Sequence, residues 1–138
     1  MVYLTPVRKV IEVLLALYIG GFGAYEWASL NAGADALYWT GQPREVVFGA
    51  ALFALGAALI HAIGIWLNSG HRWSPLVRLG GQLGEIAFVV WLVDARAGTD
   101  WSSANYTYGA IAVLYVIALT STISDTILAI RGEYGPAY

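Results

Sequence analysis

Residues 46–67 read VVFGAALFALGAALIHAIGIWL, a long apolar run for a chain of 138 residues. The run contains no Asp, Glu, Lys or Arg, and His61 is its only ionisable side chain. About 20 consecutive apolar residues are enough for an α-helix to cross the hydrocarbon core of a bilayer. This stretch therefore predicts a transmembrane helix.

Three further apolar runs accompany it, at residues 10–30, 76–93 and 109–130. The chain is 59% hydrophobic and 12% charged, whereas about a quarter of the residues of a soluble domain are charged. Because the four runs take up most of the chain, they leave no room for a soluble domain. We predict an all-α, polytopic integral membrane protein: a single domain over 1–138, four transmembrane helices in an antiparallel bundle, and both termini on the same side.

The basic residues at and near the ends of the apolar runs predict the orientation. Five lie on the side of the termini, namely Arg8, Lys9, Arg72, Arg78 and Arg131, and two lie on the other side, namely Arg44 and Arg96. Cytoplasmic loops of membrane proteins carry an excess of Lys and Arg. We therefore expect both termini in the cytoplasm, in a protein of a bacterial or phage-encoded inner membrane.

Small residues recur at about every fourth position of the apolar runs. The predicted packing positions are Ala16, Gly20, Ala24, Ala50, Ala54, Ala58, Gly81 and Gly84. In lipid, such residues allow two helix backbones to approach closely, and this close packing stabilises helix pairs. One interpretation is that they hold a single four-helix bundle together. The other is that the run at 46–67 also packs against a second copy or a foreign subunit.

Polar side chains gather in one half of the predicted membrane. The set consists of Glu12, His61, Arg78, Gln82, Glu85, Ser121, Thr122 and Asp125. With a rise of about 1.5 Å per residue, all of them fall in the half nearer the termini. Ionisable residues inside membrane spans usually face the bundle interior or a water-filled cavity and find partners there. We therefore predict a polar pocket that faces the cytoplasm.

The spacing of these residues predicts contacts within the pocket. Arg78, Gln82 and Glu85 follow an i, i+4, i+7 pattern, which places them on one face of a helix. We expect Arg78 to bridge two of the three carboxylates of Glu12, Glu85 and Asp125, and the histidine of the second run to bond the third.

Each ionisable residue also has a simpler interpretation. Glu12 and Arg78 lie close enough to the membrane boundary for their charged groups to reach water along the surface of the bundle. Asp125 is near the end of its run and could reach water as well. His61 fits a buried structural hydrogen bond better than a metal site, because its run has no second histidine one helical turn away.

The sequence gives no indication of catalysis, cofactor binding or metal binding. It contains no cysteine, which excludes disulfides and thiolate ligands. No spacing typical of a metal site, an ordered catalytic triad or a phosphate-binding loop is present. The net charge of −2 gives no reason to expect nucleic-acid binding. We therefore expect a protein that is not an enzyme.

Two classes of function remain. The first is a non-catalytic protein that acts through helix association in the lipid bilayer, as a homo-oligomer or with other membrane subunits. In size and number of spans the chain resembles some phage holins, which are self-assembling pore formers, and accessory subunits of energy-converting complexes. The second class is a proton- or ion-coupled small transporter or channel, in which the carboxylates and the histidine of one depth would exchange protons.

Overall fold

The structure is a computed structural model that describes residues 6–31, 43–67, 71–95 and 105–134. Four α-helices account for nearly all of these residues, so the described part of the chain is all-helical, as predicted. The helices are α1 (Pro6–Asn31), α2 (Arg44–Trp66), α3 (Ser74–Ala95) and α4 (Asn105–Ile130). Each contains one of the apolar runs of the sequence, except that α2 ends at Trp66, one residue before the end of its run.

Three of the helices are long and apolar enough to cross a membrane. The segments that meet this condition are Arg44–Trp66 in α2, Ser74–Leu92 in α3 and Ala110–Ile130 in α4. They support a membrane protein built as a helix bundle. The sequence predicts a fourth span in α1, which is not among these three, and this span stays a prediction.

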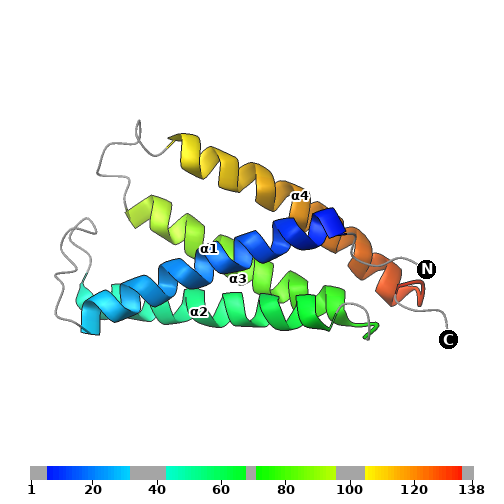
Figure 1. Cartoon of the computed structure of the whole chain (residues 1–138), viewed down its shortest axis with the longest axis horizontal. Coiled ribbons are helices and arrows are strands. Elements are labelled where there is room, and N and C mark those ends of the chain that lie inside the picture. Colours follow the sequence, from blue (N-terminus) through cyan, green and yellow to red (C-terminus); the bar gives the residue numbers. More distant parts are fainter. Residues whose placement is uncertain (1–5, 32–42, 68–70, 96–104, 135–138) are drawn as a thin grey trace.

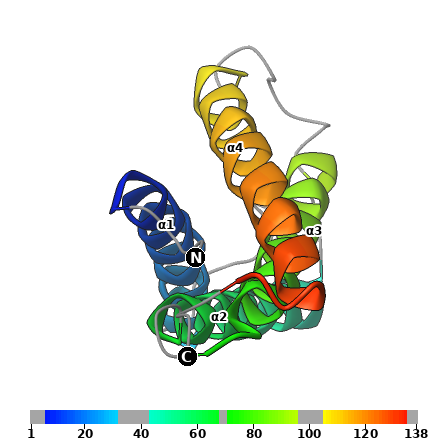
Figure 2. The same cartoon turned by 90° about the vertical axis from the view of Figure 1, so that its right-hand side faces the viewer.

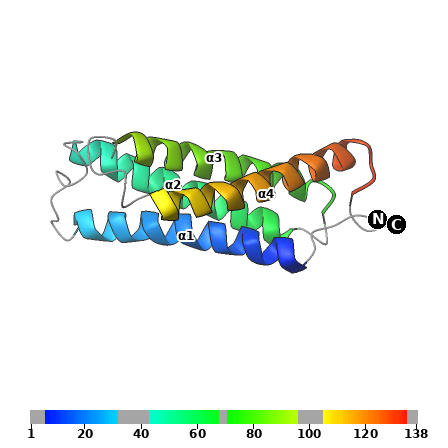
Figure 3. The ribbon, with the colours of Figure 1, turned by 90° about the horizontal axis from the view of Figure 1, so that it is seen from above.

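The helices run alternately up and down along one long axis (Figures 1 and 3). The start of α1 and the end of α4 therefore lie at the same end of the bundle (Figure 1), which we call the terminal end. Packing is most extensive between α2 and each of its neighbours, α1 and α3, whereas α4 packs mainly on α3 and less on α1. In Figure 2, α1 and α4 stand apart on the side of the bundle away from α2.

Glycines allow α2 and α3 to approach very closely. A Cβ atom added to Gly81 would lie 2.5 Å from the backbone nitrogen of His61, and one added to Gly64 would lie 2.6 Å from that of Arg78. A Cβ on Gly84 would lie 2.9 Å from the Cβ of Ala57. Any larger side chain at these positions would push the helices apart, which is the small-residue packing expected for helices in lipid.

Helix α1 packs on α2 in a similar way, along a face that differs slightly from the predicted one. A Cβ on Gly23 would lie 2.8 Å from the carbonyl oxygen of Ala51, whereas Ala24 is exposed. An α-helix has 3.6 residues per turn, so a series of every fourth residue drifts around the helix. After Ala16 and Gly20 the contact therefore passes to Gly23 instead of Ala24.

The other predicted packing positions lie on inward faces. Ala54 and Ala58 are buried and Ala50 is half-buried. Ala50 packs against an apolar core to which Ala54 belongs. This core extends from the middle of the bundle toward the end opposite the termini and is formed by Leu15, Ile19, Val47, Ala54, Phe88, Leu92, Ile111, Tyr115 and Ala118. Phe22 packs against this core, with its ring centroid 5.8 Å from that of Phe88.

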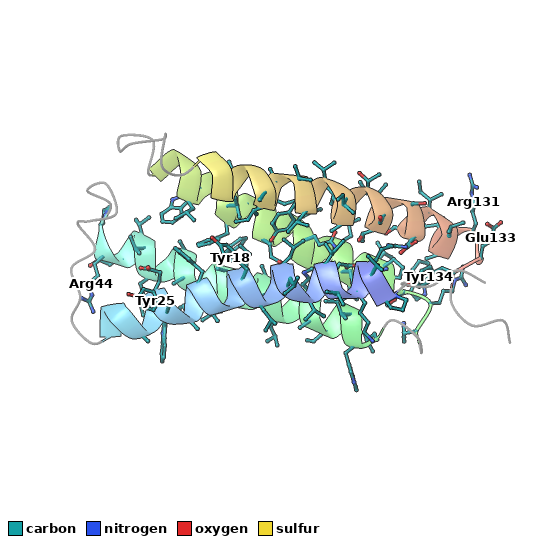
Figure 4. All side chains as sticks on the ribbon, turned by 45° about the horizontal axis from the view of Figure 1, so that its top comes forward. Tyr18, Tyr25, Arg44, Arg131, Glu133 and Tyr134 are labelled. Atoms are coloured by element: carbon teal, nitrogen blue, oxygen red, sulfur yellow. The ribbon has the colours of Figure 1, made fainter. Side chains whose placement is uncertain are left out.

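The end of α4 is shaped by a glycine. Gly132 has a φ of +77°, a conformation that glycine adopts without steric cost. Its N–H donates to the carbonyl of Ala129, and the N–H of Glu133 donates to that of Leu128, as in a Schellman motif. The turn leads the chain back to the bundle, where Tyr134 is buried. Figure 4 shows Tyr134 closer to the helices than Glu133 at the terminal end.

Candidate functional site

Buried polar side chains from all four helices meet in the half of the bundle near the terminal end. We call this set the polar network: Glu12 from α1, His61 from α2, Arg78, Gln82 and Glu85 from α3, and Thr122 and Asp125 from α4. None of the seven is more than 2% exposed. The structure thus brings together all but one of the polar residues that the sequence singled out.

Arg78 joins two other helices to α3. Its Nη1 donates to Oε2 of Glu12 at 2.7 Å, and its Nη2 donates to Oδ2 of Asp125 at 3.0 Å. The same Nη2 lies 3.3 Å from the hydroxyl of Tyr134. Arg78 therefore bridges two carboxylates. Because Arg78 and Glu12 are buried, neither reaches water along the surface of the bundle.

The imidazole ring of His61 lies between two carboxylates, those of Glu12 and Glu85. Its Nε2 is 3.1 Å from Oε1 of Glu12, and its Nδ1 contacts both carboxylate oxygens of Glu85, Oε2 at 3.2 Å. The hydroxyl of Tyr115 donates to the same Oε2 at 3.1 Å. The imidazole of α2 therefore connects α1 with α3, and Tyr115 connects α3 with α4.

Gln82 and Thr122 complete the network. The side-chain nitrogen of Gln82 donates to Oε1 of Glu12 at 2.8 Å and to the hydroxyl of Thr122 at 2.9 Å. Thr122 in turn donates to the carbonyl of Ala118, one turn earlier in α4, at 2.8 Å. Of the two adjacent hydroxyl residues in the predicted set, Thr122 faces the network, whereas Ser121 is half-buried.

Asp125 is the member of the network closest to the surface. Its Oδ2 accepts a bond from Nη2 of Arg8, whose side chain is 22% exposed. The side chain of Asp125 itself is 3% exposed, so this carboxylate does not reach water directly. The predicted direct access to water is replaced by contact with a partly exposed arginine of α1.

Three contacting residues were not expected from the sequence: Arg8, Tyr115 and Tyr134. The sequence marked Arg8 only as a basic residue on the side of the termini, and neither tyrosine was among the predicted polar residues. A signal for Tyr115 exists, because the face of α4 that carries Asp125, Thr122 and Ala118 continues one turn earlier to this residue. No comparable spacing points to Arg8 or Tyr134, which reach the network from the ends of the helical region.

The arrangement limits the chemistry of the site. Charged groups are stable in a bundle interior only when they are paired and hydrogen-bonded, and each carboxylate of the network contacts a cation or the imidazole. Within residues 6–31, 43–67, 71–95 and 105–134, no group of three His, Cys, Asp or Glu is arranged to hold a metal ion. The network suits two tasks: fixing the relative positions of the helices and binding protons.

The chain was compared with known proteins, and no protein-family model, curated protein or solved structure matches it. The functional argument therefore rests on the contacts of the polar network and on the surface of the bundle.

Proposed function

We propose that α1 is the fourth membrane span and that both termini of the chain lie in the cytoplasm. The acidic side chains of α1 support this, because Glu12 and Glu26 are buried inside the chain. The outward face of the helix carries exposed apolar residues, among them Val13, Leu14 and Leu17. A helix that turns its carboxylates inward and its apolar side chains outward is suited to lipid.

We propose that the protein acts without catalysis, through association with other membrane helices. It would serve as an accessory or structural subunit of a membrane complex or as a holin-like self-assembling pore former. One observation carries this proposal: the three apolar helices have much outward surface. Only 33%, 39% and 33% of the residues in their most apolar segments are buried within the chain.

The form of this outward surface supports association. A groove of about 260 Å³ runs between α3 and α4 and is lined by apolar side chains, including Ile86, Val90 and Leu119. A second apolar groove lies between α1 and α2, where Ala58 and Ala62 are among the lining residues. Small residues and apolar grooves are features to which helices of other chains pack in lipid.

Proton- or ion-coupled transport is a second candidate, and one observation favours it: His61 lies between Glu12 and Glu85. Transport also requires a polar route through the half of the bundle away from the terminal end. In the described part of the chain, Glu26 is the only buried carboxylate of that half, and the core around it is apolar. Association is therefore the stronger proposal.

The mass and composition of the native particle test the proposal. We would extract the tagged protein directly into native nanodiscs, weigh the particle and identify each of its chains. Foreign subunits at a fixed stoichiometry are expected for an accessory protein, and several copies of this chain alone are expected for a pore former. A particle with a single copy and no other chain would contradict association.

A flux measurement separates association from transport. In liposomes, Glu85→Leu is expected to reduce assembly, because it removes a buried contact of the network. A variant that assembles normally but loses a proton or ion flux seen with the wild type would favour transport instead. Glu45→Gln, at an exposed position in the first turn of α2, is the matched control for loss of a carboxylate.

A further inference from the structure

The two ring nitrogens of His61 both face carboxylate oxygens. Nε2 lies 3.1 Å from Glu12 Oε1, and Nδ1 contacts Glu85 Oε1. Ionised carboxylates only accept hydrogen bonds, and a neutral imidazole has one N–H group. Two such contacts need two hydrogens, so a neutral ring between two ionised carboxylates would leave one contact without a hydrogen.

The neighbouring donors do not supply the missing hydrogen. The side-chain nitrogen of Gln82 lies 3.4 Å from Nε2 of His61, but its two amide hydrogens have shorter contacts, with Glu12 Oε1 at 2.8 Å and with the hydroxyl of Thr122 at 2.9 Å. The opposite amide orientation would place the Gln82 oxygen against a carboxylate oxygen. Tyr115 donates to Oε2 of Glu85, and Arg78 donates to Oε2 of Glu12, so neither places a hydrogen between the ring and a carboxylate. One additional proton must therefore lie on the ring or on one of the two carboxyl groups.

A count of the charges in the site also gives one additional proton, independently of the hydrogen bonds. The network and its arginine at the surface contain three carboxylates, those of Glu12, Glu85 and Asp125, and two guanidinium groups, those of Arg8 and Arg78. With neutral His61 this leaves one negative charge without compensation in a site closed to water. An uncompensated buried charge is costly, and one bound proton makes the site neutral.

We infer that the polar network is a binding site for a single proton, held between His61 and the carboxyl groups of Glu12 and Glu85. The inference goes beyond the proposed association and holds whether or not protons cross the membrane. It depends on the three-residue contact and on the charges that surround it.

The groups that face this proton come from every helix of the bundle. Glu12 contacts the ring from α1, Gln82 and Glu85 approach it from α3, and Tyr115 of α4 contacts the far oxygen of Glu85. Arg78 and Asp125 lie one contact further away, with Arg8 beyond them at the surface. Guanidinium groups do not release protons, so neither arginine can pass this proton on to water.

The bound proton makes folding depend on pH in a defined direction. Above about pH 6.5 an unfolded histidine has released its proton, whereas the folded network keeps one. The folded state then binds one proton more than the unfolded chain, so the folding equilibrium constant falls up to tenfold for each pH unit. Helix α1 would be affected most, because Glu12 joins it to α2 through the protonated contact.

Spectroscopy of the wild-type protein in nanodiscs tests the inference directly. We would record ¹⁵N spectra of the histidine rings at about pH 8, well above the ordinary histidine pKa of about 6.5. The infrared carbonyl band of protonated carboxyl groups would be measured on the same sample. We expect His61 with both nitrogens protonated, or one protonated carboxyl group. His71, the other histidine of the chain, is assigned with His71→Gln.

The variant Glu85→Gln locates the proton. The new amide can donate to Nδ1 of His61, and the two remaining carboxylates balance the two guanidinium groups. The hydrogen bonds of the ring and the charges of the site are then both satisfied without an extra proton. We therefore expect a neutral ring, no protonated carboxyl group and a flatter pH dependence of unfolding. Glu45→Gln, an exposed change of the same kind, should leave all three signals unchanged.

Two results would overturn the inference. The first is a wild-type protein that has a neutral His61 and no protonated carboxyl group at about pH 8, well above the ordinary pKa values of His and Glu. The second is a proton signal that persists in Glu85→Gln, which would place the proton outside the contact of the three residues. The wild-type measurement decides the first result even if the variant does not fold.

Discussion

The two halves of this bundle are held together by different interactions. Near the terminal end, a buried arginine and a buried histidine connect carboxylates of α1, α3 and α4. Toward the other end the helices meet through apolar side chains such as Ile19, Phe88 and Leu92, and through the close approach of Gly23 to α2. Both halves are buried, but the polar network that joins all four helices lies near the terminal end.

This difference matters because lipid changes the value of each kind of contact. Lipid tails are as apolar as leucine, so there is little hydrophobic driving force between two helices within a membrane. Apolar packing then depends on fit, whereas a buried polar group without a partner is costly. We therefore expect the polar half to set the relative positions of the helices, and the apolar half to tolerate more change.

The largest effect is expected from Arg78→Leu. This change removes the cation that Glu12 and Asp125 share and leaves uncompensated negative charge in a buried site. Loss of one partner of a buried ion pair destabilises a protein by about 3–5 kcal/mol. Unfolding of the purified protein in increasing SDS, followed by circular dichroism, measures the loss.

Arg131→Leu provides the matched control, because Arg131 is exposed at the same end of the bundle. Its effect on unfolding should stay within about 0.5 kcal/mol, as for ordinary surface changes. Equal effects of the two substitutions would show that the network contributes little and would remove the distinction between the halves.

A smaller loss is expected from Glu85→Leu. Nδ1 of His61 and the hydroxyl of Tyr115 both lose their partner, and we expect about 2 kcal/mol for the two together, near the lower limit for two buried groups without a partner. The loss stays below that of Arg78→Leu because the remaining carboxylates still balance the guanidinium groups, so no buried charge is left without compensation. Glu85→Gln keeps an oxygen for Tyr115 and should cost about 1 kcal/mol or less. The same SDS titration separates the two, and a Gln variant as unstable as the Leu variant would contradict the hydrogen-bond account.

Close helix contact can be tested in both halves with glycine substitutions. Gly81→Ala places a Cβ 2.5 Å from the backbone of α2 in the polar half, and Gly23→Ala places one 2.8 Å from it in the apolar half. Overpacking of this kind costs about 1–3 kcal/mol. We expect Gly81→Ala to cost more, because it also displaces His61 from its carboxylates.

Neighbouring glycines supply the controls for this pair. A Cβ on Gly80 or on Gly21 would meet nothing within 4 Å. Because alanine favours helix more than glycine does by about 1 kcal/mol, Gly80→Ala and Gly21→Ala should be neutral or stabilising. If Gly23→Ala is as damaging as Gly81→Ala, fit alone governs both halves, and the polar contacts add nothing to it.

The sequence predicted the helices and most of the network because both follow from helix geometry. Residues at i, i+4 and i+7 share one face, so Arg78, Gln82 and Glu85 had to point in one direction. Burial of ionisable groups among themselves follows from the cost of exposing them to lipid. Contacts between Arg78 and two carboxylates, and between His61 and a third, were therefore within reach of sequence reasoning.

The remaining features depend on how the helices cross, which spacing alone does not determine. Ala24 and Gly23 are adjacent in the sequence, and only the crossing of α1 and α2 selects Gly23 as the contact. The weaker packing of α4 could not be predicted either, because small residues occur on several faces of the other helices. Arg8 was expected only to mark the cytoplasmic side, yet its long side chain reaches a buried carboxylate.

The smallest effect is expected at the boundary between the two halves, from Tyr115→Phe. The ring belongs to the apolar core, and the hydroxyl donates to Glu85 at 3.1 Å. Phenylalanine keeps the packing and removes one hydrogen bond, while Glu85 retains His61, so we expect a loss of about 1 kcal/mol in the SDS titration. Tyr25→Phe, at an exposed position, should change nothing measurable.

In a Glu85→Leu background the Tyr115→Phe change should lose its cost or become stabilising, because the hydroxyl then has no acceptor. Additive losses in the double variant would mean that Tyr115 acts through packing alone, and the polar half would then end one helical turn earlier, at His61 and Glu85.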